Sequence, residues 1–216
     1  MASIDVRDAR PEEYDEVGEA TVSGYGADDS MAEYRAVLRD VATRSKSADI
    51  IVATLDATIV GAAAYPHKGG DYEDIAFAPH EAEFRMLTTT PAGRGLGIGE
   101  LLSRECIRRA RRDGRTHVVI SVAPGNAPAE RIYQRLGFIR DPQRDWNASD
   151  GFALQCWDLD LVKYCGVCGQ DAAAAHSHRG VELEPDRFCR YCARRLQVQI
   201  MPSGSETKPC LCTTER

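Results

Sequence analysis

A glycine-rich turn between a strand-like run and a helical run places the strongest constraint on this chain. Residues 94–99 read Arg-Gly-Leu-Gly-Ile-Gly; the extended run 84–90 precedes them and the amphipathic run 97–113 follows. At such a junction several backbone N–H groups point to one spot at the helix N-terminus, which favours bound anions. Glycines leave that spot open because they carry no side chain. We therefore expect the turn to hold a phosphate-bearing cofactor, which indicates an enzyme.

Strand-like and helix-like runs alternate through the first 161 residues. The expected strands are 4–9, 49–55, 58–65, 83–89, 117–123 and 152–161, with a hairpin turn at Asp56-Ala57. The expected helices are about 11–23, 31–43, 97–113 and 126–136. This order predicts an α/β (α+β) fold in which helices flank a mixed central sheet. We divide the chain into a main domain at 1–162, a small module at 163–200 and a flexible tail at 201–216.

Acidic charge is concentrated in the main domain. Residues 1–161 contain 19 Lys and Arg against 27 Asp and Glu, a net charge of −8, whereas residues 162–216 have a net charge of +2. An acidic surface argues against general nucleic-acid binding and weakly favours a cationic substrate such as an amine, although ordinary solubility charge gives the same pattern. No apolar run approaches the ~20 residues of a membrane span, and the N-terminus does not resemble a signal peptide, so we expect a cytoplasmic location.

A second motif follows the apolar strand expected at 117–123. Residues 126–138 read Asn-Ala-Pro-Ala-Glu-Arg-Ile-Tyr-Gln-Arg-Leu-Gly-Phe. A Walker loop would need Gly-Lys before Ser or Thr, and a Rossmann turn belongs to the first βαβ unit, so neither accounts for the turn at 94–99. The two motifs together, about 30 residues apart, resemble those of the GNAT superfamily of acetyl-CoA-dependent acyltransferases. The resemblance covers about residues 4–161, including the opening at 6–13.

The resemblance implies a binding site for acetyl-CoA. In this family the glycine loop binds the pyrophosphate of coenzyme A, which here assigns Arg94, Gly95, Leu96, Gly97, Ile98 and Gly99. The preceding strand pairs its backbone with the pantetheine arm, which assigns Met86, Leu87 and Thr88. The family's Asn after the next strand, here Asn126, contacts the arm, and the Tyr of the following helix, here Tyr133, protonates the leaving thiolate. Asn126 is equally a good helix N-cap, and Tyr133 could simply be a packing aromatic.

The implied reaction is direct attack of a neutral amine on the thioester carbonyl. We expect the backbone N–H of Leu87 to stabilise the oxyanion, and a phenol with a pKa of about 10 suits protonation of a thiolate. We favour Glu83 as the base that removes the amine proton, with Glu81 and His80 as alternatives. Glu83 could instead pair with Arg85 or stay solvated. The acceptor amine, small molecule or peptide, is not readable from the sequence.

Two Cys-x-x-Cys pairs mark the C-terminal part of the chain. Cys165 with Cys168, and Cys189 with Cys192, are separated by twenty residues and supply four thiolates for one tetrahedral zinc ion. A knuckle, a hairpin at 179–183 and a helical run at 192–200 resemble a treble-clef zinc finger, in which the metal supplies much of the folding energy. Four protein ligands leave no open position, so we expect a structural zinc rather than a catalytic one.

Four further ligand candidates are left without an assignment. His176 and His178 lie between the pairs and could replace a cysteine, while Cys210 and Cys212 could be free, pair with each other or meet a metal across an interface. The zinc module could pack over the acceptor side, mediate homodimer formation or recruit a protein substrate. A second interpretation of the whole chain is a catalytically silent CoA-binding protein whose zinc finger docks a partner or nucleic acid.

Overall fold

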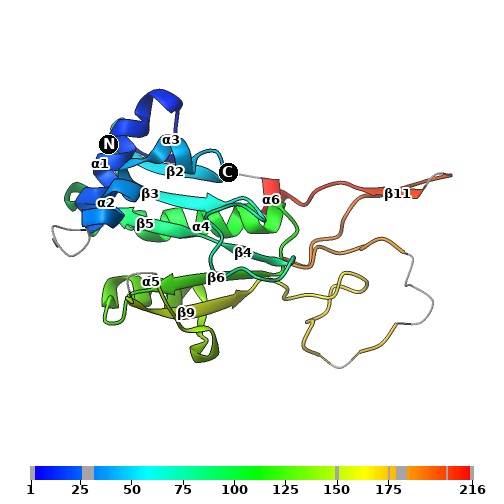
Figure 1. Cartoon of the computed structure of the whole chain (residues 1–216). Helices are drawn as coiled ribbons and strands as arrows, with labels where there is room; N and C mark the ends of the chain where they lie inside the picture. The colour runs from blue at the N-terminus through cyan, green and yellow to red at the C-terminus, as the bar shows by residue number, and fades with distance from the viewer. Residues whose placement is uncertain are drawn as a thin grey trace.

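Two sheets, joined by residues 81–89, form the frame of the protein (Figure 1). The computed structural model describes residues 3–25, 32–148, 151–174, 176–178, 184–202 and 204–214. The first sheet is antiparallel and has the order β1 (Ile4–Asp8), β2 (Ala48–Leu55), β3 (Thr58–Pro66) and β5 (Arg85–Thr89). The second has the order β4 (Glu81–Glu83), β6 (His117–Val122), β9 (Ala153–Asp160) and β7 (Ile139–Arg140), and β8 (Trp146–Asn147) pairs with β9. The pairing of β4 with β6 is parallel.

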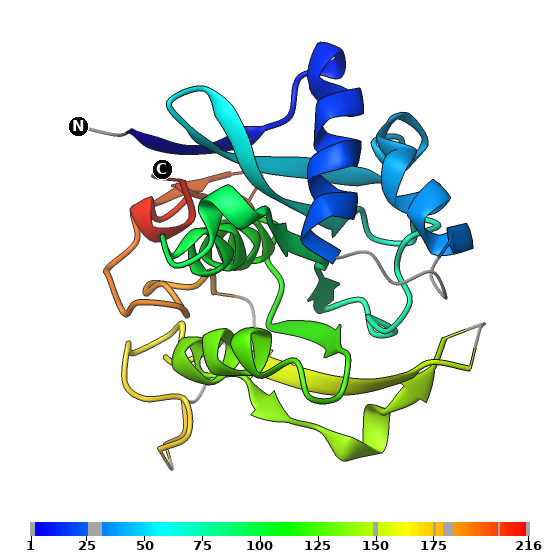
Figure 2. The ribbon, with the colours of Figure 1, turned by 90° about the vertical axis from the view of Figure 1, so that its left-hand side faces the viewer.

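Helices cover both faces of the first sheet. One face carries α1 (Tyr14–Tyr25), α2 (Ala32–Arg39) and α3 (Val41–Arg44); the other carries α4 (Ile98–Arg112), with α5 (Ala127–Leu136) next to α4 (Figure 2). In β2, Ile51 and Ala53 pack in the cluster with α4, whereas Ile50 and Val52 pack in the cluster with α1. Both faces of β2 are therefore buried, which explains its nearly continuous apolar sequence. Among the described helices, none combines the length and apolar character needed to cross a membrane.

A buried arginine anchors α4 on the first sheet. The side chain of Arg109 is 4% exposed, and its guanidinium lies 2.7 Å from Asp8 Oδ1 of β1, 2.6 Å from Asp49 Oδ2 of β2 and 3.0 Å from Glu105 Oε1. A buried guanidinium needs such partners, because an uncompensated buried charge is strongly destabilising. The cluster fixes the C-terminal end of α4 relative to β1 and β2.

Most of the expected elements of the main domain are present, with two differences. The helix expected at 31–43 is two helices, because Asp40 caps α3: its Oδ1 accepts a hydrogen bond of 3.0 Å from Thr43 N. The strand expected at 83–89 is divided into β4 and β5, which pair with different sheets. The expected hairpin turn is confirmed, since Asp56 and Ala57 both have positive φ values, as a two-residue turn requires.

The C-terminal part differs from the expectation. β10 (Val198–Met201) pairs with β11 (Gly204–Thr207), so a strand occupies the end of the helix expected at 192–200 and a hairpin extends into the tail expected to be flexible at 201–216. The short helix α6 (Leu211–Thr214) then returns to α4, and Tyr191 packs against the main domain, while other parts of the module project from it (Figure 1). The hairpin expected at 179–183 lies outside the described residues.

Replacing Ala57 by glycine is expected to raise the free energy of unfolding by about 0.5–1 kcal/mol. Ala57 has a φ of +69°, and glycine adopts this left-handed conformation without the conflict of a Cβ atom. Urea unfolding followed by circular dichroism measures the change. The matched control, Ala63→Gly in the buried interior of β3, should lower the free energy of unfolding instead. A loss of stability in both variants would contradict the turn geometry.

Candidate active site

The chain changes sheets between β4 and β5. β4 pairs with β6, whereas β5 pairs in the described part of the chain with β3 alone. Met86 lies at the change with a φ of +51°, and the register of the β3–β5 pairing shifts between Ala62 and Ala64. A bulge of this kind turns a strand out of its ladder. The β5 edge that faces away from β3 therefore presents main-chain N–H and C=O groups where the two sheets diverge.

The glycine turn follows β5 directly and begins α4. Gly95 and Gly97 have φ values of +77° and +76°, and in the part of the chain that the structure describes a Cβ atom at either position would meet nothing within 4 Å. Gly97 is the N-cap of α4, so the first N–H groups of the helix lack intrahelical partners, and the exposed Arg94 lies beside them. A Cβ atom at Gly99 would lie 3.0 Å from Ile132 Cδ1, so this glycine lets α5 approach α4. The turn is therefore an open surface with unpaired N–H groups at the positive end of a helix, an arrangement that suits an anion.

The other residues assigned to the cofactor can contribute mainly through their backbone. Ile98, Met86 and Thr88 are buried, with 1%, 6% and 5% of their surface exposed. Leu87 is half-buried, and Leu96 is 45% exposed at the tip of the turn. A cofactor arm along β5 would thus meet main-chain groups rather than polar side chains.

The helix α5 carries the predicted acid, Tyr133. The side chain of Asn126 accepts a hydrogen bond of 3.3 Å from Ala129 N, which confirms that Asn126 is the N-cap of this helix. Tyr133 is 4% exposed, and its ring centroid lies 6.2 Å from that of Phe84 and 5.5 Å from that of Phe138. Burial raises the pKa of the Tyr133 phenol well above its usual value, so the group stays protonated at neutral pH.

The carboxyl group of Glu83 is buried, and its two oxygens differ in their hydrogen bonding. Its side chain is 1% exposed, and Oε2 accepts hydrogen bonds of 2.9 Å from both Asp74 N and Ile75 N. Oε1 has no hydrogen-bond partner among the described residues and lies 3.6 Å from Arg85 Nε. Burial raises the pKa of Glu83 to about 7, against the opposing charge of Arg85. A carboxyl group with this pKa can accept or release a proton near neutral pH.

Glu83 and Tyr133 lie on opposite sides of the sheet. Successive residues of an extended run face opposite ways. Phe84 packs against Tyr133 in the core cluster beside α4, whereas the loop residue Ile75, which binds Glu83, packs with Val119 on the other face of β6. A group held at the free edge of β5 would have the carboxyl group on one side and the phenol on the other.

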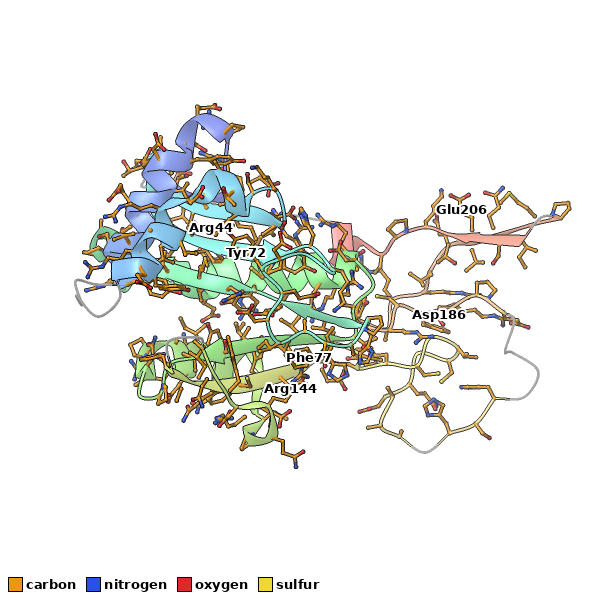
Figure 3. All side chains as sticks on the ribbon, in the orientation of Figure 1. Arg44, Tyr72, Phe77, Arg144, Asp186 and Glu206 are labelled. Atoms are coloured by element: carbon orange, nitrogen blue, oxygen red, sulfur yellow. The ribbon has the colours of Figure 1, made fainter. Side chains whose placement is uncertain are left out.

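The two alternative bases are placed less favourably. Glu81 Oε1 lies 2.5 Å from Arg144 Nη1, and although burial opposes it, this ion pair lowers the pKa of Glu81. Arg144 also lies over the ring of Phe77, with 5.7 Å between the guanidinium carbon and the ring centroid (Figure 3). His80 is exposed and packs edge-on against His117, with ring centroids 5.5 Å apart. Glu81 is thus held as a carboxylate in an ion pair, which leaves Glu83 as the better candidate.

The C-terminal ligand residues form two clusters rather than one. In each cluster the potential ligand atoms lie within 4.8 Å of one another, and each could hold a metal ion; the first contains Cys165, Cys168, His176 and His178, and the second contains Cys189, Cys192, Cys210 and Cys212. The structure therefore does not bring together the four cysteines predicted as a single site. The β10–β11 hairpin returns the chain so that residues 210–212 reach the second Cys-x-x-Cys pair.

Comparison with known proteins gives a family match and one curated relative. A model of the acetyltransferase (GNAT) family matches residues 13–138. A stretch of 74 residues, 32% of this chain, is 36% identical to streptothricin acetyltransferase of Streptomyces lavendulae. The match spans 39% of the length of that relative.

Solved structures share the architecture. The PaiA N-acetyltransferase of Thermoplasma acidophilum, in complex with coenzyme A, has a TM-score of 0.56 and 15% identity over 71% of this chain and 98% of that one. A GNAT family acetyltransferase of Brucella melitensis, in complex with acetyl-CoA, has a TM-score of 0.51 and 21% identity over 81% and 97% of the two chains. These likenesses confirm the expected mixed-sheet fold. The family model matches more than half of this chain, so the chain belongs to the GNAT acetyltransferase family.

Proposed function

We propose that the protein is an acetyl-CoA-dependent N-acetyltransferase that acts on a primary amine. The observation that carries the proposal is the free edge of β5 next to the open glycine turn at the start of α4. A cofactor with amides in its arm and phosphates at its end fits this pair of features, because the arm can add to a strand edge and the phosphates can bind backbone N–H groups. The acetyl-CoA and coenzyme A bound to the two relatives support the same cofactor here.

The proposed reaction is a direct transfer. The amine nitrogen attacks the thioester carbonyl and forms the new C–N bond, while the backbone N–H of Leu87, next to the bulge, stabilises the oxyanion. Collapse of the intermediate breaks the C–S bond, and Tyr133 donates its proton to the leaving sulfur. The proton lost by the amine passes to Glu83 through water, since this carboxyl group is almost wholly buried. The products are the N-acetylated amine and the thiol form of coenzyme A.

The placement of the two titratable groups on opposite sides of the sheet supports these roles. The attacking amine and the departing sulfur occupy different positions on the tetrahedral carbon, so the base and the acid must act from different directions. Glu83 beside the loop at 67–80 and Tyr133 beside α4 meet that requirement. We therefore assign the acceptor to the side of Glu83.

We propose a small-molecule amine as the acceptor, with a peptide amine as the alternative. The name of the curated relative specifies an acetyltransferase for streptothricin, which supports a small-molecule acceptor. The net charge of −8 over residues 1–161 attracts a cationic amine at long range. A panel of amino acids, polyamines, streptothricin and peptides would identify the class.

Gly95→Ala is expected to weaken acetyl-CoA binding at least tenfold, as isothermal titration would measure. The added Cβ atom would enter the anion site and strain a residue with a φ of +77° by about 1–2 kcal/mol. Gly114→Ala is the matched control, since Gly114 has a φ of +70° with nothing within 4 Å of a Cβ atom, but follows the other end of α4. This control should lose similar stability and bind acetyl-CoA normally. Unchanged affinity in Gly95→Ala would remove the turn from the cofactor site.

Tyr133→Phe is expected to lower kcat by a factor of about 10²–10⁴ with little change in stability, because the phenol supplies the proton for the thiolate. Release of the coenzyme A thiol in the presence of the amine panel measures the rate. The control is Tyr191→Phe in the C-terminal module. It removes a hydroxyl that donates a hydrogen bond of 2.9 Å to Arg115 O, and it should keep the wild-type rate. A full rate in Tyr133→Phe would mean that Tyr133 is a packing residue. If the wild-type protein binds acetyl-CoA but releases no thiol with any amine of the panel, a catalytically silent binding protein is favoured.

The rate at limiting amine is expected to rise with pH and level off above about pH 7. The pKa of Glu83 is raised from 4.5 to about 7, so the group becomes a base only as the pH passes that value. Glu83→Gln should lower the rate and abolish its rise with pH. The amide oxygen of the glutamine can still accept the hydrogen bonds from Asp74 N and Ile75 N. Glu81→Gln and His80→Ala should both keep the rise of the rate with pH. If one of these two variants loses that rise and Glu83→Gln keeps it, the substituted residue and not Glu83 is the base.

A further inference from the structure

We propose that the C-terminal part of the chain holds two structural zinc ions in separate four-ligand sites. The first site has the ligands Cys165, Cys168, His176 and His178, and the second has Cys189, Cys192, Cys210 and Cys212. The second site closes the end of the chain onto α4. Neither site depends on the proposed acetyl transfer.

The sulfur and nitrogen positions fit tetrahedral zinc. Zn–S bonds of about 2.3 Å at the tetrahedral angle place two sulfurs about 3.8 Å apart, and a sulfur and an imidazole nitrogen about 3.6 Å apart. The distance is 3.4 Å for Cys189 Sγ to Cys212 Sγ and 3.6 Å for Cys192 Sγ to Cys210 Sγ. Cys165 Sγ lies 3.4 Å from the Nε2 atom of His178. Within each cluster these distances suit ligands that share an ion. The sulfur–sulfur distances are also too long for a disulfide bond of about 2.05 Å.

His176 of the first site is oriented as a metal ligand would be. His176 Nδ1 lies 2.6 Å from Ala174 O, so Nδ1–H donates to this carbonyl and Nε2 carries the lone pair. A metal-bound histidine ordinarily makes such a bond with its other ring nitrogen. The knuckle that presents the two cysteines is closed by a hydrogen bond of 2.8 Å from Gly169 N to Cys165 O, and Gly169 has the left-handed φ of +74° that the turn requires.

The second site lies between two segments that both contact α4. Tyr191, inside the second Cys-x-x-Cys pair, donates a hydrogen bond of 2.9 Å to Arg115 O, and Arg111 lies over its ring. On the other side of the site, Arg108 Nη1 donates to Thr213 O at 3.4 Å. A zinc ion with four thiolates carries a charge of about −2, which these arginines at the end of α4 suit. The site therefore joins the knuckle and α6 to the same end of one helix.

The described residues of the module bury little apolar surface, which favours stabilisation by metal ions. Three of the four residues of β10 are exposed, with Ile200 at 82% exposed, and α6 has a single turn. Figure 3 shows Asp186 and Glu206 in the part of the module that projects from the main domain. Small units of this kind need metals or disulfides, and four cysteines brought together in a second cluster, with Cys189 and Cys210 buried, supply the means.

Metal analysis with X-ray absorption on the wild-type protein tests the proposal without any variant. We expect two zinc ions per chain and an average of three sulfur and one nitrogen ligands per ion, from six cysteines and two histidines. One zinc ion bound by sulfur alone would overturn the two-site proposal, because it fits either the second site alone or the single site of Cys165, Cys168, Cys189 and Cys192. Iron in place of zinc, or disulfide-bonded chains without metal, would also overturn the proposal.

Single substitutions separate the two sites. Cys212→Ser should reduce the zinc content from two to one and leave an ion with two sulfur and two nitrogen ligands. His178→Ala should also reduce it to one and leave an ion bound by sulfur alone. Cys106→Ala, which removes a buried thiol of α4 outside both clusters, should keep two ions. A zinc content unaffected by both Cys212→Ser and His178→Ala would show that these residues are not ligands.

Limited proteolysis tests the attachment to α4. In Cys212→Ser we expect a glutamyl endopeptidase to cleave after the exposed Glu206 at least tenfold faster than in the wild type, because α6 would be released. In His178→Ala, where the second site is intact, cleavage after Glu206 should keep the wild-type rate. Equal cleavage in wild type and Cys212→Ser would overturn the role of the second ion in holding the end of the chain.

Discussion

The bulge at Met86 is the constraint on which the candidate site depends. A regular strand over residues 81–89 would pair with β3 on one edge and β6 on the other and would have no free edge. The left-handed conformation of Met86 instead leaves β4 in one sheet and β5 in the other. Such a conformation costs a non-glycine residue about 1–2 kcal/mol, which the burial of Met86 and the two ladders offset. One residue thus separates the sheets, frees the edge of β5 and directs the chain into the glycine turn.

Local sequence signals predicted the parts of the site that local geometry controls. Gly95 and Gly97 take conformations that favour glycine, and Asn126 caps its helix by a bond three residues away, so the pattern alone indicated them. Met86 carries no such signal, because methionine has no preference for the left-handed region and strand pairing imposes it. The raised pKa of Glu83 was equally hidden, since it depends on a loop that folds over the side chain.

The cysteine pattern shows where sequence spacing alone fails. Two Cys-x-x-Cys pairs with the separation seen here suit one four-thiolate site, and nothing local excludes it. The actual grouping depends on the β10–β11 hairpin, which returns residues 210–212 to the second pair, and on His176 and His178, which approach the first. The run at 192–200 has helical periodicity, but the bridge between Phe188 and Arg195 and the following hairpin use its backbone bonds instead. Tertiary pairing overrode the local preference.

The helix α4 connects the glycine turn with the C-terminal module. Its N-terminal end forms the glycine turn, and its C-terminal end contacts the module through Arg108 and Arg111. Its position on the first sheet, however, is fixed by Arg109 among the carboxylates of Asp8, Asp49 and Glu105 and by the apolar cluster beneath it. Apart from Tyr191, which packs against this cluster from the module, these contacts lie within the main domain. Loss of the two proposed zinc ions is therefore expected to release the module without displacing the glycine turn. Any effect of the module on the proposed transfer would then come from what it holds near the main domain, not from a change in the turn.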